Sequence, residues 1–226
     1  MLWVDAYRPS QLQDLSYHSD ITQRLGRLAE RKATLPHLLV YGPSGSGKKT
    51  RVTALLHALY GPSAAKIRLD KRTFTTPTKR QIEIHMITSN YHIELSPGDA
   101  GLNDRFVIQE VIKEMASNKN VVSATADGGG KAASAKAPFK TVVLTEVDRL
   151  SRQAQAALRR TMEKYTSTCR LILVCNSQSK VIEPVRSRCL GIRVGAPTHD
   201  EVCMYVPVRV YNASLLLSCW LLSSVV

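Results

Sequence analysis

The stretch His-Leu-Leu-Val-Tyr-Gly-Pro-Ser-Gly-Ser-Gly-Lys-Lys-Thr, residues 37–50, decides the fold. Its apolar run at 38–41 predicts a buried strand, and a loop with three glycines follows directly. After Lys48 the apolar residues recur at helical spacing, at Val52, Leu55, Leu56 and Leu59. A strand, a glycine-rich loop and a lysine that opens a helix form a phosphate loop, whose backbone N–H groups and helix N-terminus bind an anion. The alternative is a plain glycine-rich turn before a helix.

One position of the loop departs from the phosphate-loop pattern. That pattern has Ser or Thr directly after the lysine, where the hydroxyl holds Mg²⁺. Here Lys49 stands at that position, and Thr50 is rotated by about 100° around the helix. The sequence therefore predicts nucleotide binding but does not support normal hydrolysis. The residues that we expect to bind the nucleotide in this loop are Gly42, Pro43, Ser44, Gly45, Ser46, Gly47, Lys48, Lys49 and Thr50.

Composition indicates a basic intracellular protein. The 226 residues include 31 Lys and Arg against 18 acidic residues, for a formal net charge of +13. Such an excess favours polyanionic partners, nucleic acid first, although a soluble protein can also be basic without one. The five cysteines show no paired C-x-x-C spacing, and residues 1–20 contain no secretory leader. We expect reduced thiols and no metal site.

The pattern along the chain predicts an α/β fold. Residues 1–36 read as an N-terminal arm and helix, 37–197 as the nucleotide-binding core, and 198–226 as an aberrant apolar tail. Residues 123–138 are low in complexity and predict a surface loop. Strands expected in 66–72, 73–95, 141–144, 171–175 and 192–194 alternate with helices that begin near Asp104, after Ser151 and at Pro184. This alternation predicts a parallel sheet with helices on both faces.

The ends of two predicted strands carry polar residues. Ligands of such sheets bind beyond the carboxyl ends of the strands. One strand ends in Thr145-Glu146, where Glu146 would orient the attacking water and Thr145 replaces the expected metal-binding acid. Another ends in Asn176, which either contacts a γ-phosphate or is a turn residue. With both metal positions altered, at Lys49 and Thr145, we expect weakly coordinated Mg²⁺ and little or no turnover.

The sequence resembles the AAA+ small subunits of replication factor C, the eukaryotic clamp loader, of the type numbered three. The similarity extends over about residues 1–203. The stretches that carry it are Trp-Val-Asp-Ala-Tyr-Arg-Pro at 3–9, the loop at 42–50, Ala-Leu-Arg-Arg-Thr-Met-Glu-Lys-Tyr at 157–165 and Arg-Ser-Arg-Cys at 186–189.

The resemblance implies roles for particular residues. Val4, Tyr7 and Arg8 would lie near the adenine of ATP or ADP. Arg188 would be an arginine finger that reaches the nucleotide of a neighbouring subunit. The residues implied to face that neighbour or the DNA are Arg159, Arg160 and Lys164. The implied partners are the other replication factor C subunits, the sliding clamp and primer–template DNA in the nucleus, with no membrane.

The last residues do not fit this family. Its members continue into a helical lid and collar, whereas residues 205–226 are apolar with Arg209 as their one charged residue. We expect a truncated product with lid and collar missing or incomplete, and the alternative function is a non-functional fragment that binds a partner. A membrane anchor would need about 20 apolar residues, slightly more than this segment offers. A small-molecule P-loop enzyme is a further alternative, but no second substrate site is recognisable.

Overall fold

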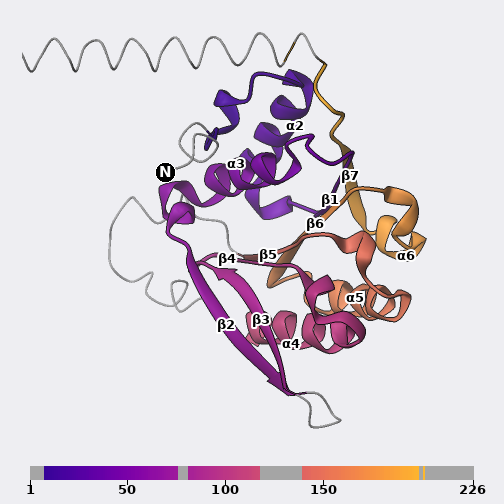
Figure 1. Cartoon of the computed structure of the whole chain (residues 1–226). Coiled ribbons are helices and arrows are strands. Elements are labelled where there is room, and N and C mark those ends of the chain that lie inside the picture. The colour runs from indigo at the N-terminus through magenta and orange to yellow at the C-terminus, as the bar shows by residue number, and fades with distance from the viewer. Residues whose placement is uncertain (1–7, 76–80, 118–138, 199–200, 202–226) are drawn as a thin grey trace, which may run out of the picture.

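A computed structural model describes residues 8–75, 81–117, 139–198 and 201. Within these residues, seven strands form one sheet in the order β2-β3-β4-β5-β6-β1-β7 (Figure 1). The low-complexity stretch 123–138, the tail from 202 onward, Val4 and Tyr7 lie outside the described residues.

Five strands of the sheet are parallel. In sheet order they are β4 (His92–Leu95), β5 (Lys140–Leu144), β6 (Cys169–Cys175), β1 (His37–Tyr41) and β7 (Cys189–Arg193). Because parallel neighbours point the same way, the carboxyl ends of β1, β5 and β6 all lie on one side of the sheet. The three segments that follow these strands therefore meet beyond their carboxyl ends.

Helices cover both faces, as predicted (Figure 1). On one face lie α2 (Ser19–Glu30) and α3 (Lys48–Tyr60), and on the other α4 (Asp104–Ser117) and α5 (Arg152–Lys164). The central strands divide their side chains between two cores: Leu38 and Val40 pack on the α2/α3 side, whereas Leu39 packs on the α4/α5 side. This alternation explains why the central strands are apolar throughout.

Two further strands add antiparallel pairing to the predicted parallel sheet. β2 (Arg68–Thr75) and β3 (Gln81–Thr88) pair antiparallel, and β3 pairs antiparallel with β4. Only five residues connect β2 to β3 and three connect β3 to β4. A parallel pair needs a crossover of about a dozen residues or more, so these connections permit antiparallel pairing only.

Other boundaries differ from expectation by a few residues. β2 begins at Arg68 rather than at residue 66, and β7 begins at Cys189 rather than at 192. The predicted helix at 184–189 is one turn, α6 (Glu183–Arg186), because the chain joins the sheet edge immediately afterwards. The short 3₁₀ turns are η1 (Leu12–Asp14), η2 (Lys32–Thr34), η3 (Gly61–Ala65), η4 (Pro97–Asn103), η7 (Val147–Arg149) and η8 (Gln178–Lys180).

A buried carboxylate locks the two helices of the α4/α5 face together. Asp104 is 2% exposed and opens α4, and Ser151 caps α5 by accepting from the Ala154 backbone N–H. The Asp104 carboxylate accepts from the backbone N–H and the hydroxyl of Ser151, at 2.7 and 3.1 Å, and from the Arg105 N–H at 2.7 Å. One side chain thus satisfies donors at two helix N-termini.

Candidate nucleotide-binding site

The loop between β1 and α3 has the backbone of a phosphate loop. Gly45 and Gly47 have φ angles of 80° and 71°, which disfavour any side chain. A Cβ on Gly42 would lie 1.9 Å from the carbonyl oxygen of Val194, so only glycine fits beside β7. The Ser46 hydroxyl donates to the Pro43 carbonyl at 2.9 Å and holds the turn. Gly47 is the N-cap of α3, whose N-terminus points at the loop.

Lys48 places its charge inside this loop. The side chain is 8% exposed, and its ammonium donates to the carbonyls of Gly42 and Pro43 at 2.8 and 2.6 Å. Burial lowers the pKa of Lys48, while the nearby Cys175 and Asp148 oppose that shift. The cation is therefore anchored by neutral carbonyls, which phosphate oxygens can replace as acceptors.

A cavity of about 500 Å³ lies in front of the loop. It lies beyond the carboxyl ends of β1, β5 and β6, which the strand order brings together. The residues that line it are Arg8, Ser44, Gly45, Gly47, Lys48, Lys49, Thr50, Thr145, Glu146, Val174, Cys175 and Asn176. Three of the predicted loop residues do not line the cavity, namely Gly42, Pro43 and Ser46.

The two altered metal positions are engaged with protein groups. The Lys49 ammonium lies 2.6 Å from Glu94 Oε1, on β4. The Thr145 hydroxyl donates to the Leu95 carbonyl at 3.2 Å and lies 2.5 Å from the Ser96 hydroxyl.

The acids beside the cavity are also paired. Glu146, in the left-handed region with φ of 54°, pairs with Arg149 at 2.8 Å. Within the described residues no three His, Cys, Asp or Glu side chains gather where they could hold a metal ion. Magnesium prefers an octahedron of oxygens that includes carboxylates. With an ammonium in the place of the usual hydroxyl, the donors present do not fit Mg²⁺.

Asp148 and Asn176 connect two strand ends. Asp148 Oδ1 accepts from the Asn176 backbone N–H at 3.3 Å. Asn176 is exposed, and its side chain borders the cavity. Asp148 thus positions the segment after β6.

Tyr17 and Arg51 brace the loop from the α2 side, and sequence reasoning missed both. The Tyr17 hydroxyl donates to the Ser46 carbonyl at 3.0 Å. Arg51 is 1% exposed, and its guanidinium lies 4.8 Å from the centre of the Tyr17 ring while donating to the Thr22 hydroxyl and to the Tyr17 carbonyl. A signal was available, because Arg51 shares the i, i+4, i+8 stripe with the apolar Leu55 and Leu59.

Arg188 lies far from the phosphate loop of its own chain. It directly precedes Cys189, which is paired with His37 at the start of β1, whereas the loop begins after Tyr41, which is paired with Arg193. Arg188 and the phosphate loop thus lie at opposite ends of β1 and β7. The Arg188 guanidinium contacts Glu163 Oε1 on α5, at 2.6 Å from a terminal nitrogen, and donates to the Pro184 carbonyl at 2.7 Å.

The basic residues predicted at an interface occupy the solvent side of α5. Arg159, Arg160 and Lys164 are exposed, while Leu158 and Met162 of the same helix are buried. Arg159 Nε donates to Glu163 at 3.4 Å, and the Lys164 ammonium lies 5.3 Å from the centre of the Tyr165 ring. Arg159 and Arg188 therefore share one carboxylate partner.

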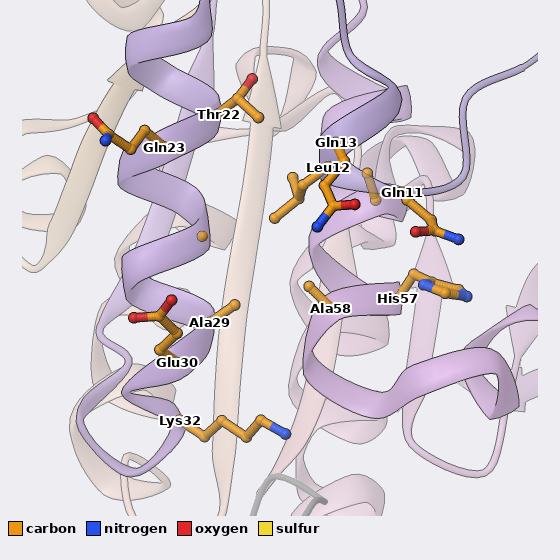
Figure 2. A pocket seen from close by; sticks show the side chains of 12 residues that line it. Gln11, Leu12, Gln13, Thr22, Gln23, Ala29, Glu30, Lys32, His57 and Ala58 are labelled. Atoms are coloured by element: carbon orange, nitrogen blue, oxygen red, sulfur yellow. The ribbon is translucent and has the colours of Figure 1, made fainter.

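Two further hollows border α3. One, of about 770 Å³, adjoins the nucleotide cavity and shares Arg8, Lys49, Thr145 and Val174 with it. The other, of about 550 Å³, lies between η1, α2 and α3 (Figure 2), with Gln11, Thr22 and His57 among its lining residues. No residue of the 42–50 loop lines this second groove, so it is separate from the nucleotide cavity.

A family model described as DNA polymerase III, delta subunit matches residues 17–197. The chain belongs to this family. The predicted AAA+ fold, a parallel sheet flanked by helices, is confirmed, with a sheet that is mostly parallel. The resemblance to replication factor C small subunits is confirmed as well. Membership of this clamp-loader family implies nucleotide binding.

Curated relatives of this delta-subunit family chain include replication factor C subunit 3 of Mus musculus, 53% identical over 202 residues, and that of Homo sapiens, 52% identical over 202 residues. Replication factor C subunit 5 of Oryza sativa subsp. japonica is 51% identical over 205 residues. Each match covers 89% of this chain and 54 or 55% of the relative. The chain thus spans about half the length of the curated relatives it matches.

A solved structure, the Thermotoga maritima RuvB Holliday junction branch migration motor, matches with a TM-score of 0.49 and 16% identity, over 83% of this chain and 48% of that one. A likeness at that level supports no inference about function. Among the described residues, no helix of this delta-subunit family member has the length and apolar character needed to cross a membrane.

Proposed function

We propose that the chain is a subunit of the sliding-clamp loader, acting with other replication factor C subunits, the clamp and primer–template DNA in replication and repair in the nucleus. Its support is the family, the names of the relatives and a net charge of +13. In this role the chain binds ATP or ADP in the loop cavity and hydrolyses ATP weakly or not at all.

The nucleotide site that we propose combines the loop with the strand ends. Gly42 to Thr50 hold the phosphates, Asn176 contacts the γ-phosphate and Glu146 orients water, while Arg8 lies near the adenine. Arg8, Glu146 and Asn176 border the same cavity as Lys48, which supports this assignment. Val4 and Tyr7, proposed beside the adenine, lie outside the described residues.

The observation that carries the proposal is the separation of Arg188 from its own loop. The register places them about five residues apart along β1, which is about 16 Å at 3.3 Å per residue. The Arg188 side chain is directed at Glu163 from the amino end of β7, so it does not serve the phosphates of its own chain. We infer that it serves a nucleotide on an adjoining subunit, as an arginine finger does.

The test is the ATPase of a complex reconstituted from this chain and its partner subunits, with clamp and DNA present. We expect Arg188→Ala to lower kcat by about 10³-fold, since arginine fingers contribute 10³ to 10⁵. Arg24→Ala is the matched control, because Arg24 is exposed on α2 and should leave the rate unchanged. An unchanged rate in the Arg188→Ala complex would exclude the role in trans.

The exposed basic side chains of α5 supply the proposed contacts to DNA or to a neighbouring subunit. A contact to a backbone phosphate is independent of sequence and depends on salt. If Arg160 makes one, Arg160→Ala lowers the slope of log affinity against log salt by about 0.9 for duplex DNA. A slope equal to that of the unsubstituted complex would assign Arg160 to the subunit interface instead.

The alternative is a partner-binding fragment without a loading function. Co-purification separates the two, because a loader subunit is recovered in the complete complex. Recovery with a single neighbouring subunit, and absence from the complete complex, would favour the fragment.

A further inference from the structure

Lys49 stands where phosphate loops place the hydroxyl that holds the metal, and its ammonium has a defined partner. The partner is Glu94 Oε1, at 2.6 Å. The side chain of Glu94 is 16% exposed and that of Lys49 is 55% exposed. Lys49 lines the nucleotide cavity, whereas Glu94 lines only the adjoining hollow. The Lys49–Glu94 pair therefore lies at the boundary between the nucleotide cavity and the adjoining hollow.

The backbone fixes both members of this pair. Glu94 is on an interior strand, paired with Ile87 of β3 on one side and with Val143 of β5 on the other. Lys49 is in the first turn of α3, directly after the loop lysine. Because neither backbone can shift easily, the ammonium is held at the N-terminus of α3, beside the phosphate loop.

We propose that the Lys49 ammonium, positioned by Glu94, takes the place of the metal ion, so that the chain binds a metal-free nucleoside di- or triphosphate. The inference rests on the proposed nucleotide binding. An ammonium has three N–H donors. One serves Glu94, and two remain for phosphate oxygens. Lys49 then bridges an acid of the protein and the phosphates, as a metal ion does at this position of other phosphate loops.

The surrounding groups support a fixed ammonium over an exchangeable metal. A divalent cation at this position would be repelled by the Lys49 ammonium, which stands in place of the usual hydroxyl. The Thr145 hydroxyl, opposite, already donates to the Leu95 carbonyl. The cavity is thus suited to the bare polyphosphate anion, with lysines as its counter-ions.

The experiment measures binding of a fluorescent N-methylanthraniloyl ADP to the full chain, in buffer with Mg²⁺ and in buffer with EDTA. For the unsubstituted chain we expect the two dissociation constants to agree within about twofold, well below the tenfold that corresponds to 1.4 kcal/mol. A loss of affinity of tenfold or more in EDTA would overturn the inference and leave nucleotide binding intact. No binding in either buffer would overturn both.

Substitutions assign the effect to the pair. Lys49→Thr restores the usual hydroxyl, so we expect affinity in EDTA to fall by about tenfold and Mg²⁺ to recover part of it. Lys49→Met keeps the apolar stem, and should bind weakly in both buffers. Glu94→Gln should weaken binding less than Lys49→Met.

The controls separate loss of binding from loss of fold. Thr53→Ala, one turn further along α3 and exposed, should leave both constants unchanged. Circular dichroism melts of each variant verify folding, which half-exposed Lys49 should not disturb. Wild-type affinity of Lys49→Thr in EDTA would contradict the role given to Lys49.

Discussion

Glu163 Oε1 lies 2.8 Å from Nε and 2.6 Å from a terminal nitrogen of Arg188, so one carboxylate oxygen fixes the guanidinium. The hydrogen bond from Arg188 is the main reason that the pKa of Glu163 is lowered. The carboxylate is therefore ionised at neutral pH, and the pair joins α5 to the segment before β7. Glu163 is a positioning residue in the proposed mechanism.

Glu163→Gln should lower kcat of the reconstituted complex by about tenfold, equivalent to 1.36 kcal/mol of activation free energy, because the guanidinium loses its anchor. KM for ATP should not change, because the nucleotide is bound elsewhere. Thermal stability should hardly change, since exposed ion pairs add little. Glu110→Gln, an exposed acid on α4, is the control, and an unaltered kcat for Glu163→Gln would show that Arg188 needs no anchor.

Gly42→Ala should lower the free energy of unfolding by about 3 kcal/mol, the upper range for forced overpacking. The added Cβ would meet the carbonyl oxygen of Val194. The backbone N–H of the same residue donates to the Tyr41 carbonyl at 2.8 Å. Urea unfolding followed by circular dichroism measures the change. Gly26→Ala is the matched control: its Cβ meets nothing within 4 Å in α2, and helix propensity predicts a gain of about 0.5–1 kcal/mol. Equal effects at the two glycines would contradict the assigned close contact.

Local patterns predicted the elements that carry the loop. The apolar run, the glycines and the helical spacing of residues 37–59 gave β1, the loop and α3 within one residue. The helix predicted to begin after Ser151 is α5, and Ser151 is its N-cap. The strand order then brought Thr145, Glu146 and Asn176 to the loop, because parallel strands end at one edge.

Contacts between distant segments could not be predicted in this way. Glu94 is 45 residues after Lys49, and only the pairing of β4 with β5 brings it within reach of α3. Glu163 meets Arg188 for a similar reason, because α5 packs against the turn before β7. Nothing in the sequence near either residue specifies its partner.

Asp104→Ala should lower the free energy of unfolding by about 3 kcal/mol, because removing the carboxylate leaves buried donors at two helix N-termini without acceptors. Denaturant unfolding measures the loss. Glu110→Ala, exposed on the same helix, tests for a general effect of removing an acid from α4 and should change stability by less than about 0.5 kcal/mol. Equal losses in the two variants would rule out the proposed lock.

His37 should make the protein less stable in mild acid. It is 7% exposed and its Nδ1 accepts from the Leu171 backbone N–H at 3.0 Å, an arrangement that requires an unprotonated Nδ1. Burial, and to a lesser degree the neighbouring Arg170, lower the pKa of His37. The unfolded chain, with a histidine pKa of about 6.5, then binds the proton first as pH falls. The free energy of unfolding therefore decreases from about pH 7 to pH 5, and is fully retained above the unfolded pKa.

His37→Asn should flatten that pH dependence, since the Asn Oδ1 can accept from Leu171 but does not titrate. Urea unfolding at a series of pH values measures the slope. A residual slope is expected from His92, which is 5% exposed and whose pKa burial also lowers. His85→Asn, on the exposed side of β3, is the control and should keep the original slope. If His37→Asn and the unsubstituted chain lose stability in parallel between pH 7 and pH 5, a group other than His37 causes the acid sensitivity.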